Sequence, residues 1–66
     1  MNLTLNGETR AFAGVADIAG LVATLGLDAR KVAVERNLEI VPRSAYQLTA
    51  LADGDRIEIV HFIGGG

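Results

Sequence analysis

The chain has 66 residues, a formal net charge of −2 and no cysteine. A chain of this length predicts one domain, whose apolar core must supply the stability because disulfides and thiolate metal sites are excluded. Six basic residues against eight acidic ones, with no basic run, argue against nucleic acid as a partner.

The first predicted element is a β-hairpin. Residues 2–5 alternate polar and apolar side chains, which is the period of a half-buried strand. Asn6-Gly7 follows and is typical of a two-residue type I′ turn, because both central positions of that turn need a positive φ. The second strand is predicted over residues 8–13.

A helix is predicted to begin after Asp17, whose carboxylate is suited to accept a hydrogen bond as an N-cap. Apolar side chains then recur at helical spacing at Ile18, Leu21, Val22 and Leu25. Gly26 is expected to end the helix in the left-handed conformation. We interpret Gly20, inside the helix, as a point of close packing against a sheet.

Three further strands are predicted in the second half of the chain. A β-branched run at 32–36 indicates the third strand. Residues 40–41 form a very short fourth strand, which Pro42 ends because proline cannot donate to a ladder. Alternation over 56–62 predicts the last strand.

The segment 44–52 is less regular than its neighbours. We expect Tyr46, Leu48 and Leu51 to pack on the core from an irregular or short helical stretch. Asp53-Gly54-Asp55 predicts a turn before the last strand. The order ββαββ(3-10)β therefore predicts an α+β fold, in which a mixed sheet of four to five strands wraps around one helix.

Few residues could carry chemistry within the chain itself. His61 is the only histidine, so no histidine cluster can bind a metal, and a lone histidine on a strand is more often structural. Ser44 lacks a Gly-x-Ser-x-Gly elbow and is interpreted as a turn residue. Arg36 and Arg43 could form an anion site, although surface arginines near turns are more common. We therefore expect no catalytic residues and no metal site.

The three glycines at 64–66 form the most distinctive segment. Glycine has no Cβ and adopts almost any backbone conformation, so we expect a thin, flexible tail after a domain spanning residues 1–63. Such a tail can enter a narrow channel that leads to the ATP site of another protein. A frayed chain end is the alternative explanation.

The sequence resembles the thiamine-biosynthesis sulfur carrier family, whose members are relatives of ubiquitin. The resemblance runs along nearly the whole chain. Its pieces, in order, are Ala33-Val34 before Asn37, then Ile40-Val41-Pro42-Arg43, Asp53-Gly54-Asp55, Ile57-Glu58-Ile59-Val60 and Gly65-Gly66. Gly64 is a departure, because it adds a third glycine where the family pattern needs two.

The resemblance implies a ubiquitin-like β-grasp fold and a carrier without its own active site or bound cofactor. It implies that an E1-like enzyme, using ATP and magnesium, adenylates the carboxylate of Gly66. A sulfur donor protein then supplies the sulfur of a thiocarboxylate, which thiazole synthase receives. No signal-peptide pattern or membrane-spanning apolar run is present, so we expect a cytoplasmic protein with no membrane partner.

The last strand also predicts a docking surface. Val60 and Phe62 alternate in step with the charged residues Arg56 and Glu58, so they are expected on the sheet face away from the helix. Ile57 and Ile59 are expected on the other face. Together with Ile63, this apolar pair lies next to the tail in the sequence. We expect these three residues to contact the activating enzyme and the synthase.

Other assignments remain open on the sequence alone. The small subunit of molybdopterin synthase shares the fold and the Gly-Gly end, although that family tends to be longer, and Val41-Pro42-Arg43 favours the thiamine pathway. Carriers for cysteine synthesis or tRNA thiolation are related alternatives. A non-covalent β-grasp interaction module with incidental glycines is the alternative from another class.

Overall fold

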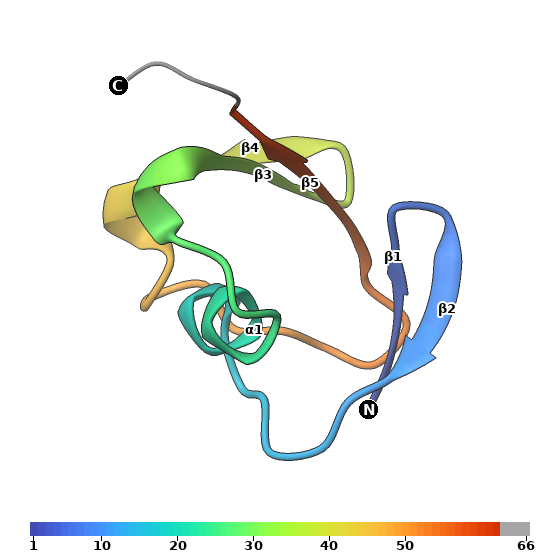
Figure 1. Cartoon of the computed structure of the whole chain (residues 1–66). Helices are drawn as coiled ribbons and strands as arrows, with labels where there is room; N and C mark the ends of the chain where they lie inside the picture. Colours follow the sequence, from blue (N-terminus) through green and yellow to red (C-terminus); the bar gives the residue numbers. More distant parts are fainter. Residues whose placement is uncertain (63–66) are drawn as a thin grey trace.

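The computed structural model describes residues 1–62 (Figure 1). Its five strands are β1 (Asn2–Leu5), β2 (Glu8–Ala11), β3 (Val32–Arg36), β4 (Glu39–Val41) and β5 (Arg56–His61). Its helical elements are the α-helix α1 (Ile18–Thr24) and the short 3-10 helices η1 (Ala29–Lys31) and η2 (Arg43–Ala45). The predicted element order is therefore confirmed. The second strand is two residues shorter than predicted, and the fourth begins one residue earlier.

The strands form one mixed sheet in the order β2-β1-β5-β3-β4. Only the β1–β5 pair is parallel, and the other neighbours are antiparallel. Figure 1 shows the sheet curving around α1. Strand β5 lies at the centre of the sheet, although it is the last strand in the sequence.

The core fills the space between the sheet and α1. Ile57 and Ile59 of β5 face inward as predicted, and Ile57 is fully buried. Tyr46 and Leu51 are also buried, as expected from the irregular segment. The prediction for Leu48 is wrong, because its side chain is 84% exposed. Its backbone N–H donates to Ala45 O at 3.0 Å in a turn after η2, which directs this side chain to solvent.

The start of α1 is held by the segment that follows η2. The Asp17 carboxylate caps the helix by accepting from the Gly20 N–H at 2.7 Å, which confirms the predicted N-cap. The N–H groups of Ile18 and Ala19 donate to the carbonyls of Thr49 and Tyr46. The amides at the beginning of a helix lack intrahelical partners, so these contacts satisfy them and tie the 46–51 segment to α1.

The end of α1 follows the predicted geometry. Gly26 has a φ of +73°, and its N–H donates to Ala23 O, while the Leu27 N–H donates to Val22 O at 3.1 Å. These two bonds form a Schellman motif. The interpretation of Gly20 as a contact with the sheet is wrong. A Cβ at that position would lie 3.3 Å from Oδ1 of Asp17, so the close approach is to the cap.

Two tight turns contain asparagine at a positive φ. Asn6 and Gly7 have φ values of 49° and 84°, which confirms the predicted β1–β2 turn. The β3–β4 turn contains Asn37 and Leu38, with φ values of 51° and 70°. Leu38 occupies a conformation that is uncommon for a residue with a bulky side chain.

Asp55, immediately before β5, is a charged residue that is buried. Its Oδ2 accepts hydrogen bonds from Nε of Arg36 at 2.7 Å and from the Ala52 N–H at 2.8 Å. Its Oδ1 accepts from Nδ2 of Asn37 at 3.0 Å. Burial by itself raises the pKa of Asp55, but these hydrogen bonds outweigh burial and hold the pKa below its usual value of 3.8.

This pKa shift predicts acid-dependent stability. The folded-state pKa of Asp55 is lowered, so its contribution is present above pH 4 and is lost as the pH falls through the folded-state pKa. Asp55→Asn should lose about 2 kcal/mol of unfolding free energy at neutral pH, because it weakens charge-assisted hydrogen bonds. It should also show a smaller further loss in acid than the wild type. Urea unfolding at a series of pH values measures both effects.

Asp28→Asn is the matched control for this prediction. The hydrogen bond from Arg30 lowers the pKa of Asp28 to about 2, but this ion pair lies at the surface, where solvent screens it. The control should keep most of the acid dependence of the wild type. An Asp55→Asn variant whose stability falls in acid as steeply as that of the wild type would contradict the assignment.

Candidate functional site

Strand β5 is the last strand before the glycines at 64–66 in the sequence, and it is paired on both sides. On one side it pairs with β3 from Arg36↔Ile57 to Val32↔His61. The Phe62 N–H then donates to Lys31 O at 2.8 Å. Pairing with β3 therefore extends to His61, and a bond to the end of η1 holds Phe62, the last residue that the structure describes. On the other side, pairing with β1 covers only Thr4↔Arg56 and Leu5↔Ile57.

The sheet face away from α1 carries an exposed apolar surface beside the end of β5. Val60 and Phe62 are 61% and 56% exposed, which confirms their predicted orientation. Ala33 of β3 pairs with Val60, and the side chain of Ile40 of β4 is also exposed. We call these four residues, Ala33, Ile40, Val60 and Phe62, the outer patch.

The outer patch is bordered by charged groups. Ala33, Ile40 and Phe62 line a shallow groove of about 320 Å³, and Arg30 and Arg43 also line it. Farther along the same face, Glu58 of β5 pairs with Glu35 of β3. An apolar centre with a charged rim is the usual composition of a protein-binding surface. The groove provides no enclosed space in which a reaction could be shielded from water.

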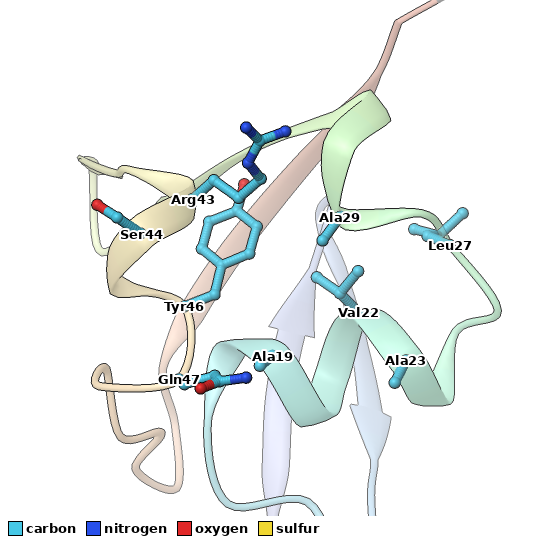
Figure 2. Close-up of a pocket in the computed structure, with 9 residues that line it drawn as sticks. All are labelled: Ala19, Val22, Ala23, Leu27, Ala29, Arg43, Ser44, Tyr46 and Gln47. Carbon is cyan, nitrogen blue, oxygen red and sulfur yellow. The ribbon is translucent and has the colours of Figure 1, made fainter.

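A second hollow lies on the helix side of the molecule, between α1 and η2 (Figure 2). It has a volume of about 720 Å³. Its lining residues are Ala19, Val22, Ala23, Leu27, Ala29, Arg43, Ser44, Tyr46 and Gln47. No carboxylate or histidine lines it to activate the Ser44 hydroxyl, so it does not form a hydrolytic site. The sequence could not indicate this cleft, because it depends on how η2 packs beside α1.

The remaining candidates do not form a chemical centre. Arg36 forms an ion pair with Asp55 through its Nε, and an anion site shared with Arg43 stays a prediction. His61 is exposed at the end of β5. Within residues 1–62, no group of three or more histidine, aspartate or glutamate residues could hold a metal ion. No helix in this part of the chain is long and apolar enough to cross a membrane.

The predicted tail residues and Ile63 lie outside the described residues. The roles assigned to Ile63, Gly64, Gly65 and Gly66 therefore remain predictions. The structure places Val60 and Phe62 together on one face, at the end of β5 from which the chain continues toward Gly66.

Comparison with known families gives a match along nearly the whole chain. The model of the ThiS family matches residues 3–66. The chain is 43% identical to the sulfur carrier protein ThiS of Bacillus subtilis, over 97% of this chain and 98% of that protein. It is also 58% identical, over its full length, to part of a thiazole synthase of Paramagnetospirillum magneticum. The chain spans only 20% of that synthase.

The fold matches a solved structure equally well. The crystal structure of a thiamine biosynthesis protein, ThiS, from Geobacter metallireducens superposes with a TM-score of 0.85. The two chains are 38% identical, and the match covers 100% of each. The predicted ubiquitin-like β-grasp fold is therefore confirmed.

Proposed function

The chain belongs to the ThiS family, and we propose that it is a sulfur carrier for thiamine biosynthesis whose reactive group is the carboxylate of Gly66. In this mechanism, the carboxylate attacks the α-phosphate of ATP in an E1-like enzyme that also uses magnesium. An acyl-adenylate forms and pyrophosphate leaves. A donor protein then releases sulfur as sulfide, which attacks the acyl carbon and displaces AMP, and the product is a thiocarboxylate.

The observation that carries this proposal is the end-to-end match with a sulfur carrier protein. The match with the Bacillus subtilis protein leaves almost no part of either chain uncovered. The arrangement of β5 agrees with a carrier role, because β3 pairs with the strand up to His61 and the end of η1 holds Phe62. Gly66 follows Phe62 by four positions in the sequence, and the residues between include two further glycines. A carrier of this kind needs no catalytic side chain of its own.

We further propose that thiazole synthase receives the sulfur and docks on the outer patch. Two thiazole synthases contain segments that are 58% and 46% identical to this chain over its full length. A carrier-like segment and a synthase are thus found within one polypeptide in these relatives. The outer patch lies beside the end of β5, so a partner seated there can reach the residues that follow Phe62. The activating enzyme is proposed to use the same patch.

Deletion of Gly66 tests the proposed reactive group. The shortened chain ends one residue earlier, and its carboxylate loses up to about 3.6 Å of reach. We expect the variant to fail in restoring growth of thiamine-requiring cells that lack their own carrier. Binding to thiazole synthase should be retained, because the outer patch is unchanged. Growth equal to that of the wild type would overturn the carrier role of Gly66.

Phe62→Asp tests the docking surface. A carboxylate at the centre of an apolar contact loses its hydration, so we expect affinity for both partners to fall by about tenfold or more. Thermal unfolding should change little because Phe62 is exposed. Isothermal titration with each partner measures the effect.

Leu48→Asp is the matched control for the docking test. Leu48 is also an exposed large hydrophobic residue, but it lies after η2 and outside the outer patch. This variant should bind both partners as the wild type does. Equal affinities for the two variants would argue against docking on the outer patch.

A further inference from the structure

The Asn6 side chain takes the place of a strand residue beside β5. Its Oδ1 accepts a hydrogen bond from the Ile59 N–H at 2.8 Å, and its Nδ2 donates to Ile59 O at 3.2 Å. The backbone N–H of Asn6 donates to Ile57 O at 2.9 Å. One asparagine in a turn thus continues the β1–β5 pairing, through its side chain, for one residue pair beyond the end of β1.

This contact is the last one on the β1 side of β5. The chain turns away at Gly7, whose φ is 84°. Within residues 1–62, no hydrogen bond joins the backbone of His61 to β1 or to the turn that follows it. From Val60 onward, the described residues are held on the other side alone, by β3 through Ala33↔Val60 and Val32↔His61, and by the bond from the Phe62 N–H to Lys31 O at the end of η1.

We propose that Asn6 is a positioning residue for sulfur loading, because it fixes the end of β5 from which the tail leaves. The inference rests on the proposed carrier function. Without the Asn6 amide, β5 loses its support on the β1 side at Ile59, so the unsupported stretch lengthens toward Ile57 and the direction of the strand end varies more. A partner must then restore that order when it binds, which weakens productive binding. Once the chain is bound, the partner holds the tail, so turnover at saturation is unaffected.

Asn37 provides an unusually close internal control. It also occupies a tight turn, and its φ of 51° is close to the 49° of Asn6. It also makes two side-chain hydrogen bonds that support β5, from Arg56 N–H at 2.9 Å and to Asp55 Oδ1 at 3.0 Å. These contacts lie at the start of β5, whereas those of Asn6 lie nearer the tail. The two asparagines therefore have similar structural roles, but Asn6 supports β5 closer in sequence to the glycine tail than Asn37 does.

The experiment compares Asn6→Gly with Asn37→Gly. Glycine accepts the positive φ of either turn, so each variant loses mainly its side-chain hydrogen bonds. The activating enzyme is assayed by ATP–pyrophosphate exchange, with the full-length wild-type or variant chain as the varied substrate. Asn6→Gly should raise KM by about tenfold, the factor expected for two lost hydrogen bonds, with kcat unchanged. Asn37→Gly should keep the KM of the wild type.

Amide hydrogen exchange supplies a readout that does not depend on a partner. In Asn6→Gly, exchange should accelerate at Ile59 and Val60 relative to the rest of the core, because the end of the strand opens locally. In Asn37→Gly, the acceleration should instead centre on Arg56. If Asn6→Gly does not fold, Asn6→Asp is used, since it keeps the acceptor for the Ile59 N–H and loses the donor to Ile59 O.

The outcomes separate this inference from the function on which it rests. A wild-type chain that the activating enzyme does not adenylate overturns the proposed function, and the positioning role with it. A wild-type chain that is adenylated, with equal KM values for the two variants, overturns the positioning role alone. A raised KM for the Asn6 variant only, with faster exchange at Ile59, supports the role.

Discussion

Strand β5 needs a partner on each side, and much of the fold is arranged to supply these partners. It comes last in the sequence yet lies at the centre of the sheet, so β1 and β3 must both be in place around it. The β1 contribution is short, and the Asn6 amide extends it to Ile59. At the other end, Asn37 and Asp55 join the β3–β4 turn to the beginning of β5. The strand that precedes the tail in the sequence is therefore also the one that joins the β1–β2 hairpin to the β3–β4 pair.

One face of the sheet packs on the core and the other is exposed to solvent. Ile57 and Ile59 point toward α1 and contribute to the core, whereas Val60 and Phe62 point away from it. Because side chains alternate along a strand, one short segment serves stability and leaves an apolar surface for partners. A small domain without disulfides can retain such a surface only if its inner face packs well. The buried set, which includes fully buried Ile18, Leu21 and Ile57, meets that requirement.

The sequence predicts the parts of the fold that depend on local rules. The Asn6-Gly7 turn, the Asp17 cap and the Gly26 helix end depend on backbone geometry that these residues favour, and all three are confirmed. The alternation in the last strand also predicts which face Val60 and Phe62 occupy.

The wrong predictions concern contacts between distant segments. Leu48 looked like a core residue by composition, but the turn after η2 directs it to solvent. The ion pair of Arg36 with Asp55, nineteen positions away, was not predicted either. The bonds of Asn6 to Ile59 span fifty-three positions, so no local pattern reveals them. The candidate site was predictable as far as Val60 and Phe62 are concerned, whereas the support of β5 by a turn residue was not.

The most direct test of the carrier account is the intact mass of the purified protein after incubation with a cognate activating enzyme, ATP, magnesium and a sulfur source. The account predicts a mass gain equal to the replacement of one oxygen by sulfur, and fragmentation should locate that gain on Gly66. An unchanged mass, with an enzyme shown to be active on another carrier in the same preparation, would contradict the account.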